Sequence, residues 1–220
     1  WVPDTMAIPG YIIESGPWKG RELLDLYRET HTPWAWHEEL FRHARDIGII
    51  PFSTPFDAPS VDFLESLGCE MYKVASFELN DIPLLRKIGL TGKTVIASTG
   101  MLSFGETSDS IRKALNAITG GHSDKIILLH CVSAYPTKIN DMNLSRMKRL
   151  KETYPFCTVG LSDHSIGHLV AGAATALGAA VIEKHLILDR AMETPDAAFS
   201  ATPQEFKAMV EHCLLVDSMV

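Results

Sequence analysis

The sequence predicts an α/β fold, a (β/α)8 barrel of which about six strand–helix units are present. Two observations support it: short apolar runs alternate with helical segments along the chain, and polar residues end every apolar run. Strand–helix repetition gives a parallel sheet. Polar residues at all the strand ends favour a barrel, because a doubly wound sheet gathers them at one switch point. The sequence also contains no glycine-rich dinucleotide or phosphate loop.

The first elements are helical. Residues 1–34 are irregular and rich in proline, with one short helix expected over residues 21–29. A clearer helix is expected to run to Ile47. Pro33 suits its first position, and Thr32 is a candidate N-cap.

Six strands and six helices then alternate. The strands are short apolar runs without regular alternation, as expected for parallel strands buried on both faces. We expect strands at 49–54, 71–75, 94–98, 126–132, 158–161 and 180–182. We expect the following helices at 59–67, 80–88, 104–119, 143–154, 166–178 and 203–219, the last with Thr202 as its N-cap.

A complete barrel takes about 250 residues and eight strands. The 220 residues are therefore expected to form one domain, residues 1–220, with strands three to eight of the barrel. The chain opens on Trp1 without a preceding Met, which predicts that it was cut from something longer and that two strands precede it.

Composition narrows the possible functions. The net charge of −7 and the lack of a Lys/Arg run argue against nucleic acid and against an anionic membrane surface. The longest apolar run, residues 169–182, is too short to span a bilayer. With no signal peptide and no CxxC spacing, the four cysteines are interpreted as free thiols in a reducing cytoplasm.

Two histidines follow neighbouring strands. His164 ends the apolar strand at 158–161, and His185 ends the one at 180–182. The pair could hold one metal ion, with water or substrate completing its shell, or serve as ordinary hydrogen-bonding residues. Side chains two apart share a strand face, so Ser162 lies beside His164 and Glu183 beside His185. Glu183 is expected either to orient His185 or to pair with a cation in the core.

A lysine and several serines end the other strands. Converging hydroxyls around one cation suit a phosphate or a phosphate ester. The alternative for each serine is an ordinary turn residue, but a lysine within a strand needs a buried partner. The residues in question are Lys73, Ser76, Ser98, Ser133 and Ser162.

Three further residues belong to the expected rim of the site. Tyr135 follows the strand at 126–132 and is placed at the barrel mouth. Phe56 is either a stacking wall or part of the core. Asp196 either caps its own loop or contacts a polyhydroxylated substrate.

Seven motifs, in this order, resemble those of the sialic acid synthases. They are FSTPF at 52–56, YKVASFE at 72–78, STGM at 98–101, HCVSAYP at 130–136, GLSDH at 160–164, EKH at 183–185 and PD at 195–196. Residues 18–27 and 32–37 look most like the pseudaminic acid synthase branch of this family.

The resemblance implies a reaction and a set of roles. The enzyme would condense phosphoenolpyruvate with 2,4-diacetamido-2,4,6-trideoxy-L-altrose in the cytoplasm, by metal-assisted aldol-type attack with C–O cleavage. Residues matching His164 and His185 would hold Mn²⁺ or Mg²⁺ and, with Lys73, would be catalytic. Phosphoenolpyruvate would contact Lys73, Ser76, Ser98, Ser133 and Ser162. The sugar would face Thr54, Phe56, Tyr135 and Asp196.

The sequence also departs from the family pattern. The N-acetyl branch often has Asn where Ser133 stands, and Glu193 and Thr194 replace a common glycine pair. The family's first-strand acid and second-strand lysine would precede Trp1. Its antifreeze-like domain, which supplies an arginine across a homodimer, would follow Val220. We therefore expect residues 1–220 alone to be poorly active.

Several alternatives remain open at this point. Within the family, the chain could be an N-acetylneuraminate or a legionaminic acid synthase. Outside it, a metal-dependent barrel hydrolase is possible, although such an enzyme normally needs more than two ligands. A third alternative is a sugar-binding or degenerate barrel without catalytic activity. It would not explain why Lys73, His164 and His185 are all present.

Overall fold

A computed structural model describes residues 10–16, 18–101, 107–120 and 125–220. Within these ranges, five parallel strands lie side by side in sequence order, with no switch point. They are β1 (Met71–Val74), β2 (Thr94–Ser98), β3 (Ile126–Cys131), β4 (Thr158–Asp163) and β5 (Ile182–Lys184). This sequential order is that of a barrel wall, as the sequence predicts.

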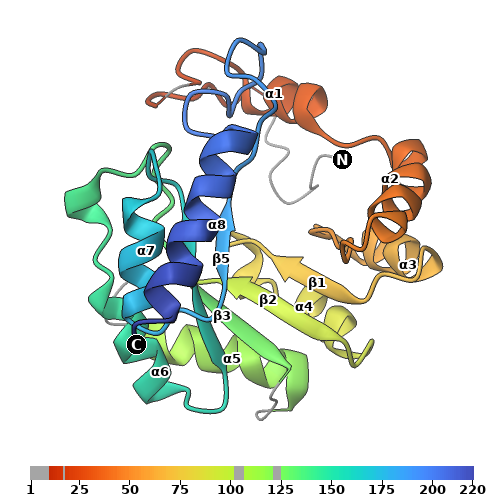
Figure 1. The fold of residues 1–220 in the computed structure, drawn as a ribbon. Helices are drawn as coiled ribbons and strands as arrows, with labels where there is room; N and C mark the ends of the chain where they lie inside the picture. The colour runs from red at the N-terminus through yellow and green to blue at the C-terminus, as the bar shows by residue number, and fades with distance from the viewer. Residues whose placement is uncertain (1–9, 17, 102–106, 121–124) are drawn as a thin grey trace.

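The sheet is strongly curved. Lys73 on β1 and Glu183 on β5 come from its two outermost strands, yet the lysine Nζ lies 3.7 Å from the glutamate Oε2. In a flat sheet the four spacings between these strands would add up to about 19 Å. The five strands therefore curl toward one another as a partial (β/α)8 barrel (Figure 1).

The helices between the strands and after β5 cover the outside of this wall (Figure 1). These helices are α4 (Ile82–Gly89), α5 (Thr107–Thr119), α6 (Ser145–Thr153), α7 (Leu169–Ala176) and α8 (Pro203–Asp217). Those before β1 are α1 (Leu23–Thr30), α2 (Trp34–Asp46) and α3 (Ala58–Ser66). Two short 3-10 helices lie at Glu78–Asn80 and Ile139–Asp141. No helix in the described ranges is long and apolar enough to cross a membrane.

The helix starts are only partly as predicted. Thr202 and Glu205 form a reciprocal capping box at the start of α8, which confirms the expected N-cap. Thr32 is not an N-cap, because the extended Pro33 occupies that position in front of α2 without a side-chain cap. Residues 104–106, the expected start of α5, lie outside the described residues.

The strand predicted at 49–54 is not formed. This segment makes a single parallel bridge, Ser53 to Tyr72, with Lys73 N–H donating to the Ser53 carbonyl. Pro51 has no N–H to offer a ladder. Ile49 and Ile50 are more than half exposed, so no sheet neighbour in the described part of the chain buries them.

The core lies between the strands and their helices. Val95, Ala97 and Leu128 from the sheet pack in one buried cluster with residues of α4 and α5, such as Leu85 and Ile111. Because successive side chains on a strand face opposite ways, this packing turns Lys73 and Ser98 toward the inside of the barrel.

Candidate active site

Lys73 lies at the centre of a buried polar group. Its Nζ donates to the Ser98 Oγ at 2.9 Å and to the Val74 carbonyl at 3.1 Å. Glu183 is its ion-pair partner and also accepts from the Ser162 Oγ at 2.7 Å. Of the two roles expected for Glu183, the structure shows the cation partner.

Ser76 and Ser133 form a neighbouring group around Gly100. The Gly100 N–H donates to the Ser76 Oγ at 3.0 Å. A Cβ on Gly100 would lie 2.6 Å from the Ser133 Oγ and 3.0 Å from the Cys131 Sγ, so only glycine fits there without displacement. The five predicted phosphate-binding residues thus come together as two groups, linked through Ser98 and Gly100 on one strand end.

The two histidines face each other at the ends of β4 and β5. Their ring centroids are 5.3 Å apart. The His164 Nδ1 lies 3.0 Å from the Val132 carbonyl oxygen, and the His185 Nδ1 lies 3.3 Å from the Asp196 Oδ2. Such contacts fix the proton on Nδ1 and leave each Nε2 as the ligand atom, which is the usual arrangement around a bound metal. The residues present therefore fit a metal.

Asp196 has a role that sequence reasoning missed. It was expected to cap its loop or to contact a sugar, whereas its carboxylate contacts His185. Its backbone carbonyl also accepts hydrogen bonds from the Ser200 N–H and Oγ within the same loop. Among the described residues, no group of three His, Cys, Asp or Glu side chains is placed to hold a metal.

Cys131 is a second residue whose place was not foreseen. Its Sγ lies 4.0 Å from the His164 Nδ1 and 3.9 Å from the Ser133 Oγ. Burial by itself would raise the pKa of this thiol, but the contacts with His164, Ser76 and Ser133 outweigh burial and lower it. Burial likewise opposes the charged form of His164, and the contacts with Cys131 and Val132 raise its pKa overall.

Tyr135 packs against both histidines. Its ring centroid is 4.3 Å from that of His164 and 6.1 Å from that of His185, while Phe199 supports it from another side at 5.4 Å. Burial, helped by nearby negative charge, raises the pKa of Tyr135 to about 12. The phenol therefore stays protonated at neutral pH and is a hydrogen-bond donor.

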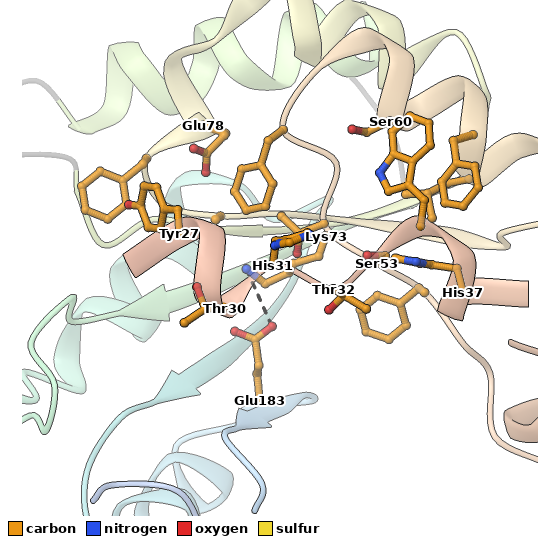
Figure 2. A pocket seen from close by; sticks show the side chains of 18 residues that line it. Tyr27, Thr30, His31, Thr32, His37, Ser53, Ser60, Lys73, Glu78 and Glu183 are labelled. Atoms are coloured by element: carbon orange, nitrogen blue, oxygen red, sulfur yellow. Dashed lines mark ion pairs between the residues drawn. The ribbon is translucent and has the colours of Figure 1, made fainter. Parts of the chain in front are cut away.

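Two cavities open on these groups. The first, of about 620 Å³, is lined by Lys73, Glu183, Thr54 and Phe56 among others. Figure 2 shows Lys73 and Glu183 facing each other across it. The second, of about 580 Å³, is lined by His185, Asp196 and the loop before Asp196. Of the residues expected to face a sugar, Thr54 and Phe56 therefore line the first space and Asp196 the second, while Tyr135 is among the lining residues of neither.

The connection between α1 and α2 lies between these spaces. Thr30, His31 and Thr32 line both cavities. Figure 2 shows these three residues among the side chains that line the first cavity together with Lys73 and Glu183. Sequence reasoning assigned no role to Thr30 and His31, and gave Thr32 only that of a candidate N-cap for α2.

Glu78 is a third residue that was missed. It lines the first cavity, is buried, and its Oε2 has no hydrogen-bond partner in the described part of the protein. Burial raises the pKa of this carboxyl. The only sequence signal was its place at the end of the motif at 72–78.

The chain is similar in sequence to known proteins. The chain matches the NeuB family over residues 5–220. It is 44% identical over 215 residues to the pseudaminic acid synthase of Helicobacter pylori, covering 96% of this chain and 62% of that protein. It is also 44% identical over 175 residues to the N,N'-diacetyllegionaminic acid synthase of Campylobacter jejuni, covering 79% of this chain and 51% of that protein.

Solved structures show the same likeness. The N-acetylneuraminic acid synthetase of Leptospira borgpetersenii, solved in complex with citrate, superposes with a TM-score of 0.81 at 32% identity, covering 89% of this chain and 67% of that one. A truncated 3-deoxy-D-arabino-heptulosonate 7-phosphate synthase from Thermotoga maritima shares the fold, with a TM-score of 0.72 at 18% identity. The chain spans about three fifths of the length of the first curated relative named above and about half the length of the second.

Proposed function

The chain belongs to the NeuB family of sialic acid synthases, and on that premise we propose that the full-length protein is a phosphoenolpyruvate-dependent nonulosonate synthase. Its proposed sugar is 2,4-diacetamido-2,4,6-trideoxy-L-altrose, and the products are pseudaminic acid and phosphate. The observation that carries the proposal is the buried Lys73, bonded to Ser98 and paired with Glu183, on the same barrel interior as two histidines whose Nδ1 atoms contact Val132 and Asp196.

Lys73 is the proposed phosphate anchor. Two of its donors are engaged at 2.9 and 3.1 Å, while its contact with Glu183 is longer, at 3.7 Å. An ammonium has three donors, so one is available for a phosphate oxygen. Ser76, Ser98 and Ser133 add hydroxyl donors around the same ligand, and Ser162 would join them by turning its O–H from Glu183 to the ligand. Because Lys73 is buried, its charge acts on that ligand through a medium of lower dielectric constant than water.

His164 and His185 are the proposed metal ligands. Mn²⁺ suits two imidazole nitrogens better than Mg²⁺, which prefers an all-oxygen shell. When bound, the metal supplies Lewis-acid polarisation of the sugar aldehyde. Asp196 and the Val132 carbonyl hold the two rings with Nε2 outward. Tyr135, which stays protonated, offers a donor to a sugar oxygen beside them.

The proposed reaction forms one C–C bond and breaks one C–O bond. C3 of phosphoenolpyruvate bonds to the aldehyde carbon of the open-chain sugar, and the cationic C2 that results takes up water. The tetrahedral intermediate then expels phosphate with its bridging oxygen. Lys73 and the serines neutralise the charge that grows on the leaving phosphate, which is how preorganised donors lower a barrier.

A phosphate-release assay tests the proposal. The full-length protein is given phosphoenolpyruvate with the altrose derivative, or with the sugar precursor of legionaminic or N-acetylneuraminic acid. We expect release with the altrose derivative and none from Lys73→Met. Lys87→Met, which removes an exposed ion pair with Asp62, is the control and should retain activity. Faster release with another of the sugars would move the assignment to that branch of the family.

The metal assignment has its own test. Titration calorimetry should show Mn²⁺ binding to the wild type and none to the His164→Ala, His185→Ala double variant. His43→Ala, on the exposed face of α2, is the control. Unchanged Mn²⁺ affinity in the double variant would show that the site is elsewhere.

We further propose that the full-length protein is a cytoplasmic homodimer, and that the 220 residues alone turn over slowly. Sedimentation of the full-length protein tests the dimer. Turnover by residues 1–220 at the full-length rate would contradict the second expectation.

A further inference from the structure

Trp18 joins two loops that hold the histidines. Its Nε1 donates to the Pro195 carbonyl at 3.2 Å, and its ring centroid lies 5.8 Å from that of Tyr135 at an interplanar angle of 46°. Pro195 directly precedes Asp196, the partner of His185, and Tyr135 packs on His164. One side chain thus reaches His164 through Tyr135, and His185 through Pro195 and Asp196.

The backbone around Trp18 is itself held in place. Ile12 and Glu22 form an antiparallel bridge. The Ile13 N–H donates to the Arg21 carbonyl at 2.9 Å, and the Gly20 N–H donates to the Ile13 carbonyl at 2.8 Å. Trp18 therefore sits near the tip of a small hairpin in front of α1. Figure 1 shows this part of the chain beside the loop that follows β5.

We propose that Trp18 is a positioning residue of the synthase site, which sets the loop before Asp196 and the Tyr135 ring at the correct separation for the two histidines. Tryptophan suits this task because its apolar ring packs on an aromatic neighbour while its N–H bonds to a carbonyl. The proposal rests on the proposed function. It adds that a segment distant in sequence from the two histidines controls the affinity of the site for metal.

Two substitutions separate the two contacts of Trp18. Trp18→Phe keeps a ring beside Tyr135 and loses the bond to Pro195, whereas Trp18→Ala loses both. We expect Mn²⁺ affinity to fall about tenfold in Trp18→Ala, the lower end of what loss of a ligand's supporting partner costs, and less in Trp18→Phe. Phosphoenolpyruvate affinity should stay within about twofold, since Trp18 contacts neither Lys73 nor its partners in the described structure.

Calorimetry with Mn²⁺ and with phosphoenolpyruvate measures both affinities, and amide exchange of residues 192–200 and 135 reports the loops directly. Tyr11→Ala, in the same hairpin but with its side chain half exposed, is the control. Wild-type Mn²⁺ affinity and exchange in Trp18→Ala would overturn the proposal. So would equal losses of Mn²⁺ affinity, phosphoenolpyruvate affinity and Tm, which a purely structural role predicts. Neither measurement needs turnover, so an inactive wild type would refute the function and leave this inference standing or falling on its own data.

Discussion

Lys184 donates to the carboxylate of Asp163 across 2.7 Å, in a buried ion pair one residue before each of the two histidines. The two are register partners on β5 and β4, and their side chains are 2% and 0% exposed. The preceding register pair, Ser162 and Glu183, faces the other side of the sheet and forms the polar group around Lys73. Because successive side chains alternate between faces, Ser162 and Glu183 belong to the polar group around Lys73, and Asp163 and Lys184 form a buried ion pair on the other face.

Removing the cation of this buried Lys184–Asp163 ion pair should destabilise the fold. Lys184→Met leaves the Asp163 carboxylate buried, with the Ser165 N–H as its remaining hydrogen-bond donor among the described residues. Breaking a buried ion pair in this way costs about 3–5 kcal/mol. Urea unfolding followed by circular dichroism measures the loss.

An exposed pair is the control. Lys148 and Glu152 on α6 are 80% and 64% exposed, so Lys148→Met should change stability by less than about 1 kcal/mol. Equal effects of Lys148→Met and Lys184→Met would mean that the buried pair contributes nothing specific.

Gly100→Ala should weaken phosphoenolpyruvate binding with the fold retained. The added methyl group would enter the space held by the Ser76 and Ser133 hydroxyls, at 2.9 and 2.6 Å. Overpacking of this kind costs about 1–3 kcal/mol, which corresponds to a loss of affinity of roughly 5- to 150-fold if it falls on the binding site. Calorimetry with phosphoenolpyruvate measures it, and wild-type affinity would remove these serines from the ligand site.

Glu78 should make stability depend on pH. Burial raises its pKa in the folded state, so folding favours the protonated carboxyl. This contribution is fully present below the unfolded pKa of about 4.3 and is lost as pH rises through the folded pKa. Glutamine does not ionise, so Glu78→Gln does not lose stability in this way as the pH rises. The free energy of unfolding of Glu78→Gln relative to the wild type should therefore increase with pH up to neutrality.

Urea unfolding of both proteins between pH 4 and 8 measures the effect. Glu211→Gln, at an exposed position on α8, should track the wild type throughout. If Glu78→Gln were less stable than the wild type at pH 8, the carboxylate would have a stabilising partner that the described structure does not show.

Asp196→Asn should weaken Mn²⁺ binding. The neutral amide keeps the shape of the side chain and loses the charge that orients His185. Loss of such a partner typically costs 10- to 100-fold in metal affinity. Asp189→Asn, in the same loop but bonded to the Ala191 N–H, is the control for calorimetry. Equal affinities in the two variants would separate Asp196 from the metal.

Local pattern was enough to predict the barrel and the inward-facing Lys73, because strand period and strand-end polarity are local properties. It could not predict that Glu183 reaches Lys73, since that contact depends on how far five strands curl. Asp196 and Trp18 act through loops whose path no periodicity encodes. The segment at 49–54 looked like a strand because its composition is apolar, although pairing, which decides strand formation, involves residues far away in sequence.

The central claim is that this protein joins phosphoenolpyruvate to an acetamido sugar with cleavage of the C–O bond. The most direct measurement uses phosphoenolpyruvate labelled with ¹⁸O at the bridging oxygen and follows the label by mass spectrometry. We predict that the label leaves in inorganic phosphate and that the nonulosonic acid carries none of it. Label retained at C2 of the product would contradict the mechanism, and no consumption of phosphoenolpyruvate with any of the three sugars would contradict the function.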